Sequence, residues 1–181
     1  MTGKDELKVA IGGLGAIGMK VARTLDEGGI PGCRLVAVSA GDKDRARQRI
    51  ADFNSPPDVT DLAGLADKAD IIVECVPARL FDEIARPALE AGRIFIPLSV
   101  GALLERMELV DLAKRKGGRI HVPSGALLGL DAVAGAAAGE IRSVTMETRK
   151  PPRGLKGAPY VEQNNIDLDA VTEPTVIFEG S

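Results

Sequence analysis

The chain has the size and composition of an ordinary globular protein. Its 181 residues, 45% hydrophobic and 27% charged, are enough to bury a core, and a net charge of -3 gives no basic surface of the kind that binds nucleic acid. No run approaches the roughly 18 apolar residues that a membrane span requires. We therefore expect neither nucleic acid nor a membrane among the partners of this protein.

Apolar strands alternate with helices along the first two thirds of the chain. The first predicted helix carries Ile17, Val21 and Leu25 four residues apart, and therefore on one face. Strands are predicted at residues 7–11, 34–39, 71–76, 93–98 and 119–122, and helices at 16–27, 43–52, 61–66, 80–91 and 103–116. This alternation predicts an α/β fold, a doubly wound parallel sheet of the Rossmann type.

The composition changes after Val122. Residues 123–139 are small and glycine-rich, residues 141–148 alternate like a half-exposed strand, and residues 175–178 look like one further strand. We place a domain boundary here, between residues 1–122 and residues 123–181. Because two strands alone are marginally stable, we expect the second, α+β domain to be incomplete and the sequence to be cut short.

The cysteines and the N-terminus favour the cytoplasm. Cys33 and Cys75 lie in different predicted elements and form neither a disulfide framework nor a metal site. The first residues lack the cleavage site of a signal peptide. With a single histidine and no tryptophan, the chain has no histidine cluster for a metal, so we expect an organic cofactor instead.

The most informative motif is a glycine-rich turn between the first strand and the first helix. Its pattern is Gly-x-Gly-x-x-Gly, with the glycines at 13, 15 and 18. In this context the glycines permit a tight turn and let backbone N–H groups approach a pyrophosphate at the start of the helix. We therefore predict that residues 1–122 bind a dinucleotide through Gly13, Gly15, Ala16, Ile17 and Gly18.

The end of the second strand leaves the choice between NAD and NADP open. An acid that would bind the ribose of NAD is missing at the strand end, and Asp42 comes slightly late. Asp42 is a cofactor-binding candidate, or alternatively a helix N-cap. Lys43 and Arg45 could neutralise a 2′-phosphate, or belong to a solvated helix face.

Three later turns are predicted to line the same site. Ligands of such sheets bind beyond the carboxyl ends of the strands, where small residues leave room for a nicotinamide-ribose. Tight packing between layers is the alternative explanation. The cofactor-binding candidates in these turns are Cys75, Val76 and Pro77, then Ser99, then Ser124, Gly125 and Ala126.

Two further residues are weaker candidates. His121 is the only histidine and therefore the only candidate general acid or base of that type, although its place in a predicted strand favours packing or solvent. Lys150 ends the first predicted strand of the second domain and could face a substrate carboxylate, or simply be solvated.

Several motifs together resemble the L-aspartate dehydrogenase family of NAD biosynthesis. They are GLGAIG at 13–18, VEC at 73–75, PSGALLGLD at 123–131, TRKPP at 148–152 and VIFEGS at 176–181. The resemblance implies oxidation of L-aspartate at Cα by NAD(P) to iminoaspartate, which yields oxaloacetate and ammonia or feeds quinolinate synthesis. It also implies that Ala126 contacts the cofactor, and that the catalytic histidine and a cofactor-binding asparagine lie downstream of Ser181.

Two expectations concern activity and assembly. Without the downstream histidine, the 181-residue chain should bind dinucleotide but oxidise aspartate poorly or not at all. Independently of the resemblance, a homodimer or larger homo-oligomer is expected, because a domain cut in this way often exposes a sheet edge or an apolar face that a second chain covers. Two alternatives stay open: another two-domain dehydrogenase, acting on homoserine or a sugar, and a non-catalytic dinucleotide-sensing module.

Overall fold

The computed structural model describes residues 6–125 and 129–180. Contacts divide the chain after residue 128 into two compact units, which are described separately. The boundary predicted at residue 123 lies close to this division and stays a prediction. No helix in the described ranges has the length and apolar character needed to cross a bilayer.

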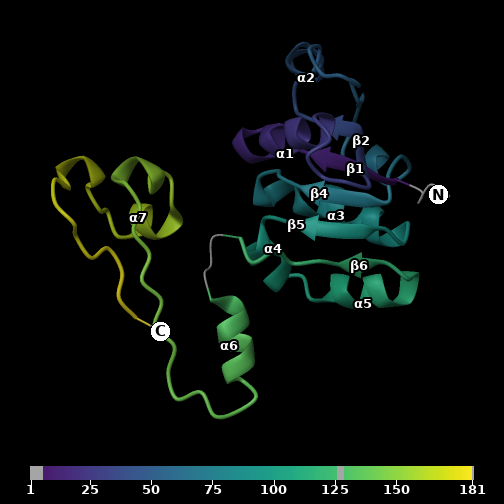
Figure 1. Cartoon of the computed structure of the whole chain (residues 1–181). Helices are drawn as coiled ribbons and strands as arrows, with labels where there is room; N and C mark the ends of the chain where they lie inside the picture. Colours follow the sequence, from purple (N-terminus) through teal and green to yellow (C-terminus); the bar gives the residue numbers. More distant parts are fainter. Residues whose placement is uncertain (1–5, 126–128, 181) are drawn as a thin grey trace. The chain divides into compact units, whose positions relative to one another are not determined.

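The first unit is built on a six-stranded sheet in which every neighbouring pair is parallel (Figure 1). Its strand order, β3-β2-β1-β4-β5-β6, is that of the Rossmann fold, so the predicted fold class is confirmed. The order reverses between β1 and β4, where a crevice opens at the carboxyl ends. The strands are β1 (Leu7–Gly12), β2 (Cys33–Ser39), β3 (Asp58–Thr60), β4 (Ile71–Glu74), β5 (Ile94–Pro97) and β6 (Arg119–Ile120).

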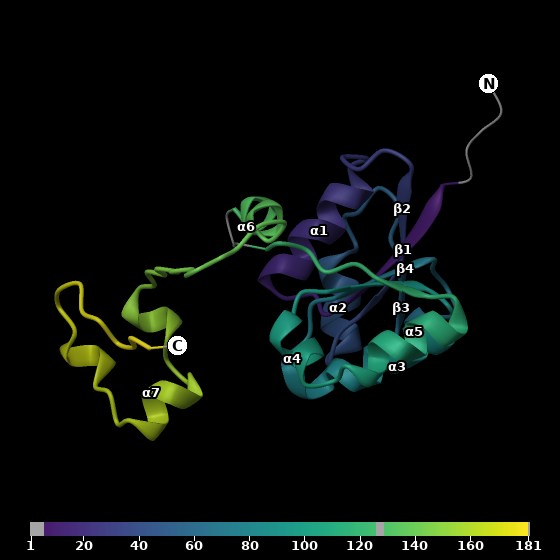
Figure 2. The ribbon, with the colours of Figure 1, turned by 90° about the horizontal axis from the view of Figure 1, so that it is seen from below.

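Helices cover both faces of this sheet (Figure 2). On one face, α1 (Ala16–Asp26) and α2 (Lys43–Arg49) bury Ala22, Leu25 and Ala46 against the sheet. On the other, α3 (Phe81–Glu90), α4 (Val100–Leu104) and α5 (Glu108–Lys116) pack around Phe95. Alternate residues of a strand point to opposite faces, so β1, β2, β4 and β5 each contribute side chains to both cores.

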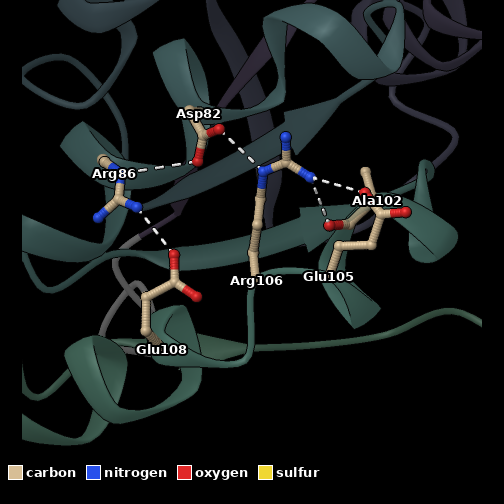
Figure 3. A network of polar contacts seen from close by, with 6 residues as sticks. All are labelled: Asp82, Arg86, Ala102, Glu105, Arg106 and Glu108. Carbon is tan, nitrogen blue, oxygen red and sulfur yellow. Dashed lines mark hydrogen bonds and ion pairs between the residues drawn. The ribbon is translucent and has the colours of Figure 1, made fainter.

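The predicted helix at 103–116 is wrong in one respect, because it is broken into α4 and α5 (Figure 3). The Arg106 guanidinium donates to the Ala102 carbonyl oxygen at 3.0 Å and to the Asp82 carboxylate of α3 at 2.8 Å. The backbone N–H of Arg106 bonds instead to Leu103. A side chain thus replaces the backbone donor that a continuous helix would supply to Ala102, and the chain turns there.

The same break joins three helices by ion pairs (Figure 3). Arg86 of α3 contacts Glu108 of α5 at 2.8 Å and Asp82 at 3.6 Å. Arg106 approaches Glu105 at 3.6 Å. These contacts fix α4, whose first turn follows the end of β5 directly, and so they support the loop that enters the crevice.

The second unit contains short helices and no strand in its described residues, 129–180. Its elements are α6 (Leu130–Ala136), η3 (Pro152–Gly154), α7 (Pro159–Gln163) and η4 (Leu168–Ala170). The strands predicted at 141–148 and 175–178 are therefore wrong for this chain. An isolated extended segment cannot satisfy its backbone groups without a neighbouring strand, and Val144 and Met146 are instead exposed.

Candidate dinucleotide site

A cleft of about 310 Å³ opens at the carboxyl ends of β1, β4 and β5. It therefore lies at the reversal of strand order, where open α/β sheets bind their ligands. The residues that line it come from the glycine-rich turn, from the turn after β4 and from the end of β5. They are Gly15, Ala16, Ile17, Gly18, Cys75, Val76, Leu98 and Ser99.

The three glycines of the turn differ in what they meet. Gly13 has φ +95°, and a Cβ there would overlap the Cys75 carbonyl oxygen. A Cβ at Gly18 would overlap the Gly13 carbonyl oxygen. At Gly15 no protein atom lies within 4 Å of a Cβ position. The fold itself therefore requires Gly13 and Gly18, whereas the open space above Gly15 fits a ligand that approaches the backbone closely.

A buried carboxylate holds the other side of the cleft together. Glu74 ends β4 and is fully buried. It accepts backbone N–H bonds from Val76 at 2.8 Å, from Leu98 at 3.1 Å and from Ser99 at 2.8 Å. The Ser99 hydroxyl lies 3.1 Å from the carboxylate and 3.3 Å from the Val76 carbonyl, so it can donate to either. Glu74 thus fastens the turn after β4 to the turn after β5.

Cys75 follows Glu74 in the chain, lines the cleft and is half-buried. Burial, and to a smaller extent the negative charge of Glu74, raise its pKa to about 12. At neutral pH Cys75 is therefore a protonated thiol. It can pack against a ligand, but it is no nucleophile.

The end of β2 is where the predicted dinucleotide would place its adenosine. There the Asp42 carboxylate accepts the Arg45 backbone N–H at 2.9 Å and caps α2, which is the second of the two roles considered for it. Lys43 and Arg45 are exposed. The Arg49 guanidinium donates to the Leu14 carbonyl oxygen inside the glycine-rich turn.

The remaining predicted site residues are not brought into the cleft lining. Pro77 is exposed, and Ser124 and Gly125 are exposed in the segment that follows β6. Ala126 lies outside the described residues. His121 is exposed just beyond β6, and its backbone N–H donates to Phe95. Lys150 is exposed in the second unit.

Sequence reasoning missed three residues of this region: Glu74, Leu98 and Arg49. A signal existed for Glu74, because an acid at the end of an otherwise apolar strand needs several donors. No comparable signal marks Arg49, one of several charged residues on α2. No group of three or more histidine, cysteine or acidic residues that could hold a metal occurs in the part of the chain that the structure describes.

Two protein families match consecutive parts of the chain. Residues 13–123 match the family described as homoserine dehydrogenase, NAD binding domain. Residues 131–181 match the family described as aspartate dehydrogenase, C-terminal. The first match covers the glycine-rich turn and the whole cleft lining, and the second begins within α6.

Curated relatives named L-aspartate dehydrogenase resemble the chain over its full length. That of Bradyrhizobium diazoefficiens is 48% identical over 99% of this chain and 64% of the relative. L-aspartate dehydrogenase 3 of Bordetella bronchiseptica is 49% identical over 100% of this chain and 66% of the relative. The chain therefore spans about two thirds of the length of these relatives.

Solved structures share the fold of the first unit. An NAD binding oxidoreductase from Klebsiella pneumoniae is 21% identical, with a TM-score of 0.57 over 75% of this chain and 40% of its own. Biliverdin reductase from Synechocystis, in complex with biliverdin and NADP+, is also 21% identical, with a TM-score of 0.54 over 65% and 37%. At these identities the likeness concerns the fold alone.

Proposed function

The chain belongs to the L-aspartate dehydrogenase family, and we propose that it forms the dinucleotide-binding part of an enzyme that oxidises L-aspartate with NAD or NADP. The observation that carries the proposal is the open space above Gly15, in a turn whose other two glycines are required by the fold. A packing turn would need no such space, and a pyrophosphate does.

The matched families support aspartate over the other candidate substrates. The NAD-binding match concerns a domain that dehydrogenases of several substrates share, so it does not distinguish homoserine from aspartate. The match over residues 131–181 is to the aspartate dehydrogenase C-terminal family and concerns the segment outside that domain. It favours an enzyme over a non-catalytic sensing module.

Each side of the cleft has a distinct part in the proposed site. Backbone N–H groups at Ala16 and Ile17, at the start of α1, would hold the pyrophosphate. The turns fastened by Glu74 would place Val76 and Ser99 beside the nicotinamide-ribose. Bound NAD(P) would supply the acceptor for a hydride from Cα of aspartate, and loss of a proton from the α-ammonium group would complete the C=N bond of iminoaspartate.

Binding and turnover can be tested separately. Titration of the chain with NADH and NADPH, followed by nicotinamide fluorescence, should give saturable binding. Gly15→Ala should weaken that binding about 10-fold or more, because a methyl group would fill the space for the pyrophosphate. Gly135→Ala, where a Cβ also meets no protein atom within 4 Å, is the matched control in the second unit.

Turnover tests the substrate. In a protein that contains this chain and the remaining length of its relatives, NAD(P) should be reduced with L-aspartate and not with L-homoserine or sugars. Saturable reduction with homoserine alone would contradict the proposal. An absence of dinucleotide binding by the 181-residue chain would contradict it at an earlier step.

The compartment and assembly state belong to the same proposal. Both cysteines are free thiols, which suits a reducing cytoplasm. Val100, Leu104, Met107 and Val122 are exposed apolar side chains on the first unit, which suits a homodimer or larger homo-oligomer. Light scattering after size-exclusion chromatography would measure the assembly directly.

A further inference from the structure

Arg49 lies beside the glycine-rich turn, on the side of β2. It is the last residue of α2, and its Nη1 atom donates to the carbonyl oxygen of Leu14, between Gly13 and Gly15. The Leu14 side chain is only 5% exposed and packs in the same core as Ala46 and Ile50 of the α2 segment. The position of this guanidinium is therefore fixed by the turn itself.

Among the described residues, no carboxylate neutralises the charge of Arg49. Arg47, on the same helix, pairs with Asp44 at 2.6 Å, and Arg23 of α1 pairs with Asp52 at 3.0 Å. Arg49 forms no ion pair within residues 6–125 and 129–180, and its partner is a neutral carbonyl. A guanidinium has five N–H donors, so most of them stay available to an anion.

The end of β2 leaves room for such an anion. Ser39 is buried, and the next acid, Asp42, caps α2 rather than closing the strand end. A Cβ at Gly41 would meet no protein atom within 4 Å. An acid that ends β2 would bind the ribose diol and repel a 2′-phosphate, and none occupies that position here.

We infer that Arg49 binds the 2′-phosphate of NADP, and that the chain prefers NADP to NAD. In folds of this topology the adenosine ribose lies between the glycine-rich turn and the end of β2, and Arg49 is anchored at that place. A guanidinium recognises phosphate through paired hydrogen bonds, so the preference arises from the adenosine end of the cofactor. The inference rests on the proposed dinucleotide site.

Two ligands that lack nicotinamide measure the binding of the adenosine part of the cofactor separately. Calorimetry should show that the chain binds adenosine 2′,5′-bisphosphate (2′,5′-ADP) about 10-fold or more tightly than 5′-AMP, since the two differ only by the 2′-phosphate. Arg49→Gln should remove most of this difference while changing the affinity for 5′-AMP by about 2-fold or less. Arg47→Gln, whose arginine is paired with Asp44, is the control and should leave both affinities unchanged.

Other results of this calorimetry would overturn the inference about Arg49. An equal loss for both ligands in Arg49→Gln would mean that Arg49 only holds the turn, and would overturn the inference, as would unchanged affinities. If Arg49→Gln fails to fold by circular dichroism, Arg49→Lys decides, with a several-fold loss expected for 2′,5′-ADP alone. A chain that binds NADH and 5′-AMP but gains no affinity from the 2′-phosphate overturns this inference and leaves the proposed function standing. A chain that binds none of these ligands overturns both.

Discussion

The two sides of the cleft keep their shape by opposite means. On the β1 side, the turn depends on residues without side chains. Gly13 and Gly18 let backbone segments approach each other at positions where a Cβ atom would overlap with backbone. On the β4 side, the turns are joined by an added side chain, the fully buried Glu74 carboxylate with its donors from Val76, Leu98 and Ser99. Close approach and a buried charge thus give two preformed walls of one site.

This difference determines whether a substitution on each wall should first lower the stability of the fold or the affinity for the ligand. Removing the carboxylate leaves buried N–H groups without acceptors, which costs stability first. Adding a methyl group to the glycine turn costs stability only where the fold needs the space, and costs ligand affinity where only the ligand needs it. Substitutions on the two sides can therefore separate the needs of the fold from those of the cofactor.

The largest effect is expected at Glu74. Glu74→Ala should lower the free energy of unfolding by about 3–5 kcal/mol, because several buried donors lose their acceptor together. Glu74→Gln keeps one acceptor oxygen but turns an NH₂ group toward N–H donors, so it should lose about 2–3 kcal/mol. Urea denaturation followed by circular dichroism measures both. A loss below about 1 kcal/mol in Glu74→Ala would contradict a clamp by this carboxylate.

A smaller loss is expected at Gly18. Gly18→Ala places a methyl group against the Gly13 carbonyl oxygen, and backbone on both sides must shift. Overpacking of this kind costs about 1–3 kcal/mol, and here it should also weaken dinucleotide binding. The comparison with Gly15→Ala is decisive: that variant should keep its stability within about 0.5 kcal/mol and lose affinity only. Equal destabilisation by both would mean that the fold needs all three glycines.

The parallel sheet could be predicted because its elements carry local signals. Apolar runs and the four-residue spacing of Ile17, Val21 and Leu25 predicted most strands and helices within a few residues. β3 was missed because it has three residues and acquires its conformation by pairing with β2. The break between α4 and α5 was missed because it depends on Arg106 meeting Asp82, which is distant in sequence.

Most residues that line both walls of the candidate site were predicted from the sequence, including Cys75, Val76 and Ser99, but the Glu74 clamp behind the second wall was not. A glycine pattern with fixed spacing can be recognised in the sequence, so the β1 turn was identified from residues 13–18. The bonds of Glu74 to residues 98 and 99 join positions more than twenty apart, and no local pattern contains them. The strands expected at 141–148 and 175–178 failed for a related reason, since a strand exists only with its partner.

A modest effect is expected from the Ser99 hydroxyl. Ser99→Ala removes a donor to Glu74 or Val76 but keeps the Ser99 backbone N–H on the carboxylate. The free energy of unfolding should fall by about 1 kcal/mol, as for one hydrogen bond. Urea denaturation of Ser99→Ala and Glu74→Ala under the same conditions measures this loss. If Ser99→Ala lost as much free energy of unfolding as Glu74→Ala, the hydroxyl rather than the backbone N–H groups would be the main partner of the carboxylate.

The smallest effect concerns Cys75, which lies between the two walls and reports on both. Because its pKa is raised from 9.0 to about 12, its thiolate fraction should rise about 10-fold per pH unit up to that value. In a Cys33→Ser background, alkylation by iodoacetamide should therefore accelerate steadily from pH 8 to pH 11, whereas the urea-unfolded chain should level off above its ordinary pKa. The same pKa shift makes the free energy of unfolding depend on pH. The thiol of the unfolded chain loses its proton first, so the folded state loses stability as pH rises from about 9 toward 12.

Saturating NADH or NADPH should slow the alkylation of Cys75 further, since Cys75 lines the cleft beside Gly18. Unchanged alkylation under saturating cofactor would mean that the dinucleotide lies elsewhere, and the two walls would then enclose no common ligand.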